Sequence, residues 1–177
     1  MELVERLQWA GIVGCGGAGF PTYAKYAGKE IHTIIINGAE CEPLLQTDKF
    51  IMRNYSNRLV GAADYLMRET GAEKCVFALK KSYKREQEAL ERAIKETESS
   101  ISIYSLDNFF PAGDEQTIVY EVTGKVIPPT AIPLAVSCVV NNIATLLCIA
   151  DAIEEKVYIK KYLTVTGEVK KPIVANV

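Results

Sequence analysis

Four short, predominantly apolar runs constrain the fold of this chain more than any other feature of its sequence, and the first of them is rich in β-branched residues. They cover residues 32–37, 74–79, 101–106 and 136–140. Outside them, apolar residues recur at helical spacing, which predicts a helix in each of five further segments. These segments are residues 2–9, 48–70, 83–97, 113–123 and 142–153. Because strands alternate with helices, we predict an α/β fold: a Rossmann-like, doubly wound, mostly parallel sheet with helices on both faces.

The last part of the chain has a different pattern. Residues 162–169 predict one more strand that ends in a turn, and no closing element is evident after it. We therefore predict that residues 1–155 form the α/β domain. Residues 156–177 are expected to be the start of a following β-rich domain that is cut short in this sequence.

Charge and hydropathy narrow the class of protein. Lysine and arginine number 20 against 22 aspartates and glutamates, a formal net charge of −2. The chain therefore lacks the basic field that attracts nucleic acid or anionic lipid. Its first residues are acidic, unlike a secretory signal, and no run of about 18 uncharged apolar residues suits a membrane-spanning helix. These features predict a soluble, cytoplasmic protein that neither binds nucleic acid nor inserts into a membrane.

The cysteines argue against a metal site within this chain. The five of them, at positions 15, 41, 75, 138 and 148, form no C-x-x-C or C-x-x-x-C pair, and there is a single histidine. Zinc and iron–sulfur sites draw on closely spaced cysteines or on histidines. We therefore expect no bound metal here, and reduced thiols in a cytosolic compartment.

A glycine-rich segment, residues 14–19, is the first feature that suggests chemistry. It reads Gly-Cys-Gly-Gly-Ala-Gly and contains the pattern G-x-G-x-x-G. Glycine allows the backbone to come close to a phosphate or a flat ring, and its N–H groups can bind anions. A helix rather than a strand is predicted before this loop, so it fails the test for a Rossmann dinucleotide fingerprint. On the pattern alone, a flexible turn is an equally good interpretation.

Three polar clusters follow predicted strands. They are Asn-Gly-Ala-Glu-Cys-Glu-Pro at 37–43, Pro-Ala-Gly-Asp-Glu at 111–115 and Asn-Asn at 141–142. Open parallel sheets bind ligands just outside the carboxyl ends of their strands, so the clusters and the glycine loop are expected to meet at one crevice. Each cluster alone also has a structural interpretation, as a solvated turn, as helix N-terminal acids or as an N-cap. Their convergence favours a ligand site.

Four motifs together carry a resemblance to known proteins. They are Gly-Ile-Val-Gly-Cys-Gly-Gly-Ala-Gly-Phe-Pro-Thr (11–22), Ile-Asn-Gly-Ala-Glu-Cys-Glu-Pro (36–43), Pro-Ala-Gly-Asp-Glu (111–115) and Val-Asn-Asn (140–142). In this order they resemble the C subunit of the Rnf electron-transport complex and, more distantly, the NADH-binding flavoprotein subunit of respiratory complex I. Similar domains occur in cobalamin reductases and in the electron-transfer protein associated with proline reductase.

The resemblance implies that FMN lies across the crevice with NADH stacked on its face. It implies FMN contacts for Gly14, Gly16, Gly17, Lys25, Asn37, Glu40, Gly113, Asp114, Asn141 and Asn142. It places three residues on the NADH side, Phe20, Glu42 and Glu115. No catalytic side chain is implied, because hydride passes from nicotinamide to the flavin itself.

The implied activity is that of an NADH-oxidising flavoprotein module, an oxidoreductase in electron transport. Its electrons would pass singly to iron–sulfur partners, with the 4Fe–4S clusters in domains or subunits outside this chain. The resemblance also allows peripheral attachment to a membrane complex on its cytoplasmic face.

Two positions depart from the complex I pattern. Ala39 stands where those flavoproteins have aspartate, so one polar contact to the nucleotide is missing. Cys15 stands where they have arginine, and it is either a redox relay with a lowered pKa or a small filler residue, of which we favour the filler. We expect Cys75, Cys138 and Cys148 to belong to the core.

Two other functions are compatible with the sequence. A docking scaffold of an electron-transfer complex would keep the fold and lose nucleotide binding, as the residues at 15 and 39 hint. An ordinary NAD-dependent dehydrogenase would bind no flavin. The helix before the glycine loop, and the lack of an evident catalytic histidine or tyrosine, count against that second alternative.

Overall fold

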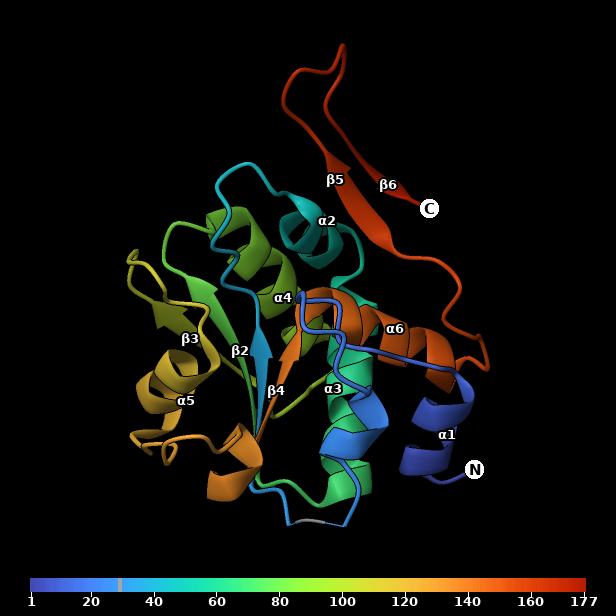
Figure 1. Cartoon of the computed structure of the whole chain (residues 1–177), viewed down its shortest axis with the longest axis vertical. Coiled ribbons are helices and arrows are strands. Elements are labelled where there is room, and N and C mark those ends of the chain that lie inside the picture. Colours follow the sequence, from blue (N-terminus) through green and yellow to red (C-terminus); the bar gives the residue numbers. More distant parts are fainter. Residues whose placement is uncertain (29) are drawn as a thin grey trace.

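A four-stranded parallel sheet forms the centre of the molecule, which the computed structural model describes over residues 1–28 and 30–177 (Figure 1). Its strands are β1 (Thr33–Asn37), β2 (Lys74–Lys80), β3 (Ser102–Leu106) and β4 (Cys138–Asn142). All neighbours are parallel, in the order β3-β2-β1-β4. The predicted parallel α/β sheet is confirmed, and each predicted strand lies within two residues of its observed position.

Six α-helices and two 3₁₀ turns are found among the described residues. They are α1 (Leu3–Trp9), η1 (Thr22–Lys25), α2 (Thr47–Asn54), α3 (Ser56–Thr70), α4 (Lys84–Glu96), α5 (Glu115–Thr123), η2 (Pro133–Val136) and α6 (Ile143–Ile153). The single helix predicted over 48–70 is wrong in one respect. It is two helices, because Tyr55 has non-helical backbone angles, φ −130° and ψ 22°.

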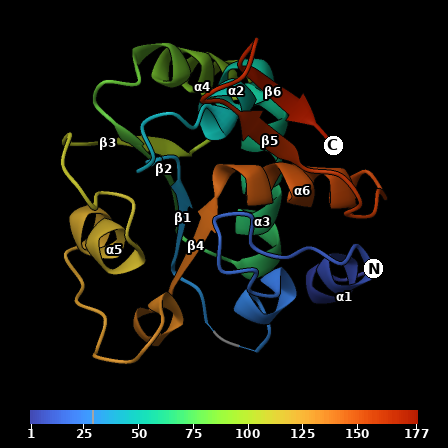
Figure 2. The same ribbon diagram turned by 45° about the horizontal axis from the view of Figure 1, so that its top comes forward.

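Helices cover both faces of the sheet, as Figure 2 shows. Helices α2, α3, α4 and α6 pack on one face, whereas α5 packs on the other. Strand side chains alternate between the two layers: Ile34 and Ile36 belong to the first core, and Ile35 belongs to the second. Because both faces of β1 are buried, its apolar run is continuous, and each buried isoleucine contributes about 1.5–3 kcal/mol.

The strand order creates a switch point beside the central strand. Strands β2 and β3 follow on one side of β1, and β4 returns to its other side. In such sheets a crevice opens at the carboxyl ends of the two strands where the order reverses. Asn37 and Asn142 are register partners at these ends. The glycine-rich loop is closed by a bridge between Val13 and Pro21.

The end of the chain forms a hairpin that projects beside α2 (Figure 1). Strands β5 (Tyr162–Val165) and β6 (Ile173–Asn176) pair antiparallel, so the strand predicted there has a partner that the sequence analysis missed. The hairpin contacts the start of α2, since the Thr164 hydroxyl accepts a hydrogen bond from the Gln46 N–H at 3.0 Å. None of the helices in residues 1–28 and 30–177 is long and apolar enough to span a bilayer.

Candidate functional site

A cavity of about 400 Å³, the small cavity, lies at the switch point. Nine of the thirteen residues that the resemblance singled out line it. They are Gly14, Gly16, Phe20, Lys25, Asn37, Glu40, Gly113, Glu115 and Asn142. The structure therefore brings the glycine loop and all three polar clusters together around one space.

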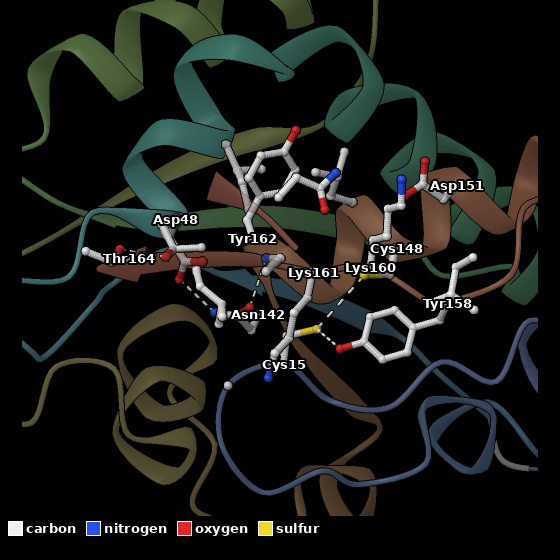
Figure 3. Close-up of a pocket in the computed structure, with 18 of the residues that line it drawn as sticks. Cys15, Asp48, Asn142, Cys148, Asp151, Tyr158, Lys160, Lys161, Tyr162 and Thr164 are labelled. Carbon is white, nitrogen blue, oxygen red and sulfur yellow. Dashed lines mark hydrogen bonds between the residues drawn. The ribbon is translucent and has the colours of Figure 1, made fainter. Parts of the chain in front are cut away.

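A second cavity of about 950 Å³, the large cavity, adjoins the first. The two share Gly16, Glu40, Asp48 and Asn142 as lining residues. Its far wall is the segment after α6 that leads into β5, and in Figure 3 the Tyr158 hydroxyl points toward Cys15. The Tyr162 ring packs against Phe50 and Tyr55. Gly17 and Glu42 line this cavity, so the three residues expected on the NADH side are divided between the two spaces.

Asp114 and Asn141 are not among the described lining residues of either cavity. The Asp114 carboxylate instead caps α5, where it accepts hydrogen bonds from the N–H groups of Gln116 at 3.0 Å and Thr117 at 3.1 Å. The buried Asn141 amide donates to the Tyr26 hydroxyl at 2.5 Å. Successive strand residues face opposite ways, so only one of two adjacent asparagines lines the site. Direct ligand contacts of Asp114 and Asn141 stay a prediction.

Asn37 joins two of the polar clusters. Its side-chain N–H donates to the Gly113 carbonyl at 2.8 Å, and its Oδ1 accepts from the Ala39 N–H at 3.0 Å. The two loops approach so closely that a Cβ at position 113 would lie 2.3 Å from the Ala39 carbonyl oxygen. Glycine at 113 is therefore required by the contact between backbones, and the ends of β1 and α5 are held together.

The end of β2 and the start of α4 position Glu40. The Lys80 ammonium donates to the Glu40 carbonyl at 2.7 Å, and the Tyr83 hydroxyl donates to the same oxygen at 3.2 Å. Glu40 Oε1 accepts from the Glu42 N–H at 2.9 Å. The sequence analysis missed these supports, although Lys80 stands at a strand carboxyl end, the position that drew attention to the other clusters.

Lys25 supplies a cation at the wall of the small cavity. The turn η1 directs its Nζ to the Val140 carbonyl at 2.6 Å, and the Glu115 carboxylate lies 3.9 Å away. The side chain is only 17% exposed. Burial lowers the pKa of Lys25, whereas the charge of Glu115 opposes that change. A partly desolvated cation of this kind attracts an anionic ligand strongly.

Asp48 is a site residue that the sequence analysis did not identify. It lies in the first turn of α2, where the helix dipole by itself favours an acidic residue. It is nevertheless buried and lines both cavities. Burial raises the pKa of Asp48 to about 7, although a hydrogen bond from the Asn142 amide at 2.7 Å acts in the opposite direction. Figure 3 shows the Asp48 carboxylate and the Asn142 amide directed at each other at the wall of the large cavity.

Cys15 lies in the glycine loop and lines the large cavity. Its backbone N–H donates to the Thr145 hydroxyl at 2.9 Å, and its sulfur lies 4.0 Å from Cys148 Sγ and 3.6 Å from the Tyr158 hydroxyl. The hydrogen bond from Cys148 lowers the pKa of Cys15 to about 6, against the effect of burial. Across the described residues, no three His, Cys, Asp or Glu side chains are arranged to hold a metal ion.

Comparison with known proteins places this site in a family. Residues 7–151 match the Nuo51 FMN-binding domain. A cobalamin reductase, PduS, of Citrobacter freundii is 39% identical over 174 residues, which are 98% of this chain and 38% of that protein. The C subunit of the Na⁺-translocating ferredoxin:NAD⁺ oxidoreductase complex of Acetobacterium woodii is 36% identical over 168 residues, 92% of this chain and 38% of that protein.

A solved structure agrees in fold. One chain of an NAD⁺-reducing [NiFe]-hydrogenase superposes with a TM-score of 0.85 at 23% identity, over 99% of this chain and 36% of that one. This chain thus spans well under half the length of the relatives and of the hydrogenase chain. The resemblance to the Rnf-type C subunits drawn from the four motifs is confirmed, and this chain belongs to the Nuo51 FMN-binding domain family.

Proposed function

We propose that this chain is an electron-input module that binds FMN in the small cavity, oxidises NADH and passes the electrons to iron–sulfur partners. The observation that carries the proposal is the convergence of the glycine loop, the Lys25 cation and three polar clusters on one space at the switch point. The family adds FMN as the ligand class.

The residues of the small cavity fit a flat, anionic cofactor. A space of about 400 Å³ is within the usual range for small-molecule sites. Gly16 presents bare backbone at the junction of the cavities, and a Cβ there would come no nearer than 3.5 Å to the Asn142 side chain. Gly17 has a φ of +117°, which glycine adopts without strain. The glycine backbone and the Lys25 ammonium therefore suit a phosphate or an anionic ring.

Each polar group has a distinct part in holding the cofactor. Lys25 would supply positive charge to the bound anion, and Glu40 and Asn142 would meet polar edges of the ring or the ribityl chain. Asn37 and Gly113 tie the surrounding loops together. When bound, FMN supplies hydride acceptance from nicotinamide and the release of single electrons. Preorganised loops lower the ordering cost of binding, since the polar groups are already placed.

Phe20 and the acids Glu42 and Glu115 are proposed to receive the NADH. Phe20 is 40% exposed and lines the small cavity, so its ring is available to stack against a nucleotide base. The large cavity, which opens from the small one at Gly16, has room for the rest of a dinucleotide. The name of the Acetobacterium relative, which belongs to a ferredoxin:NAD⁺ oxidoreductase complex, supports this choice of donor.

The electron acceptor is proposed to lie outside this chain. The relatives are more than twice as long, and residues 156–177 are proposed to lead into a further β-rich domain of the same protein. Iron–sulfur clusters in such domains or in partner subunits would take electrons one at a time. We place the protein in the cytoplasm, with peripheral attachment to a membrane complex in the Rnf-type arrangement.

Two measurements on the purified chain test this function. Titration with FMN is expected to quench flavin fluorescence and to raise the unfolding temperature, with a stabilisation of about 2.7 kcal/mol at a hundredfold excess over Kd. Addition of NADH without oxygen is then expected to bleach the flavin absorption. Unquenched flavin would refute the proposed cofactor site and favour the docking scaffold. Bound flavin that NADH does not bleach would refute NADH oxidation.

A further inference from the structure

Two thiols from distant parts of the sequence meet at the wall of the large cavity. Cys15 stands in the glycine loop and Cys148 in α6, 133 positions later, and their sulfur atoms are 4.0 Å apart. Figure 3 shows both sulfurs turned toward each other, with the Tyr158 hydroxyl directed at Cys15. Cys148 is buried as the sequence predicted, but it is a neighbour of the loop cysteine and not only a core residue.

We propose that Cys15 and Cys148 form a reversible disulfide that fastens the glycine-rich loop to helix α6. The sulfurs must approach by about 2 Å, because a disulfide bond is about 2.05 Å long. Cys148 is fixed within a helix, whereas Cys15 lies between Gly14 and Gly16, whose backbones rotate with little steric hindrance. The required movement is therefore available on the side of the loop.

The surroundings make one thiol the nucleophile and the other the resolving group. The Cys148 S–H and the Tyr158 hydroxyl can both donate to the Cys15 sulfur, and the Lys161 charge lies nearby, so the pKa of Cys15 falls to about 6. The same hydrogen bond, together with burial, raises the pKa of Cys148. At neutral pH a thiolate therefore faces a protonated thiol, the arrangement in which disulfides form. Because Cys15 lines a cavity of about 950 Å³, a small oxidant can reach it.

The oxidant in the proposed reaction is hydrogen peroxide. The Cys15 thiolate attacks one oxygen of hydrogen peroxide, the O–O bond breaks, and a sulfenic acid and hydroxide form. The Cys148 sulfur then attacks the Cys15 sulfur as the S–O bond breaks, and its proton leaves with the oxygen as water. The hydroxide from the first step combines with the proton that Cys15 released when it ionised. In total, two thiols and one peroxide give one disulfide and two waters. Two molecules of a thiol such as glutathione reverse the reaction and become glutathione disulfide.

A consequence for the ligand site follows, and it rests on the proposed function. Gly14 and Gly16 flank Cys15 and line the small cavity, whereas Cys148 lines only the large one. A bond between the two cysteines draws the loop toward α6 and away from the small cavity. We therefore infer that the oxidised form binds FMN several-fold more weakly than the reduced form.

Peptide mapping of the wild-type chain, treated with hydrogen peroxide and then with dithiothreitol, tests the disulfide. The expected product has lost two hydrogen atoms, contains a peptide that links Cys15 to Cys148, and returns to the dithiol on reduction. Cys138→Ser, which removes a buried cysteine of β4, is the matched control and is expected to form the same link. In Cys148→Ser, Cys15 is expected to accumulate as a sulfenic acid that dimedone traps.

Separate oxygen adducts on the two cysteines without a linked peptide, or a link to Cys41 instead, would overturn the proposal. The wild-type map decides this even where a serine variant fails to fold. FMN titrations of the reduced and the linked chain then test the consequence for binding, and equal affinities would refute it. If neither form binds FMN, the proposed function fails, whereas the disulfide is judged by the map alone.

Discussion

Replacing Asp48 by asparagine tests the electrostatics at the junction of the two cavities. The aspartate is buried in the first turn of α2, and its Oδ2 accepts from the Asn142 amide. Glu40, which lines both cavities too, adds negative charge to its surroundings. Asparagine has the same shape and keeps one oxygen acceptor, so the substitution removes the ionisable group and preserves the hydrogen bond.

The sign and size of the effect follow from the raised pKa. Burial raises the pKa of Asp48 from 3.8 to about 7, so the folded chain holds this proton more firmly than the unfolded chain does. The stabilisation is complete below the pKa of the unfolded state and is lost as the pH rises through that of the folded state. Each tenfold change in proton affinity corresponds to about 1.4 kcal/mol, so the loss is at most about 4 kcal/mol.

Urea unfolding of both proteins at several values from about pH 4 to about pH 8 measures this loss. We expect the unfolding free energy of Asp48→Asn to rise steadily relative to that of the wild type over this range, because other groups titrate equally in both. Asp107→Asn, which changes an aspartate with a 74% exposed side chain, is the control, and its difference from wild type is expected to stay flat. A flat difference for Asp48→Asn as well would refute the burial argument.

Three further substitutions test the rest of the site. Gly16→Val is expected to abolish flavin quenching, because the added methyl groups would enter the cavity. The urea midpoint should change little, since the new Cβ would have ordinary contacts at 3.5 Å. Gly61→Val, at an exposed position of α3, is the control and should bind flavin normally. Gly113→Ala is expected to lower the unfolding free energy by about 1–3 kcal/mol, since its Cβ would lie 2.3 Å from the Ala39 carbonyl oxygen. An unchanged urea midpoint would contradict the close approach of the two backbones. Lys25→Met is expected to weaken FMN binding by about tenfold in a fluorescence titration, because the variant loses the free energy of one charge-assisted hydrogen bond. An equal Kd would show that this lysine does not contribute to FMN binding.

The elements of the sheet could be predicted because their signals are local. The run Thr33-Ile-Ile-Ile-Asn37 is continuous and β-branched, and a strand buried on both faces needs that composition. The polar clusters were recognisable for the same reason, because each follows a predicted strand. The glycine loop was recognisable from its own composition. The break at Tyr55 was not predicted, because the apolar spacing continues across it and only the backbone angles change.

The sequence by itself determined the parallel α/β fold, the family and nine of the residues that line the small cavity, because apolar periodicity, glycines and short motifs act within a few positions of one another. The tertiary structure alone decided which polar groups touch. Asp48 meets Asn142 across 94 positions, and Cys15 meets Cys148 across 133. Such contacts depend on how α6 packs against α2 and the glycine loop. Neither the spacing of apolar residues nor any motif contains that arrangement, and so the raised and lowered pKa values of these groups became apparent only in the folded chain.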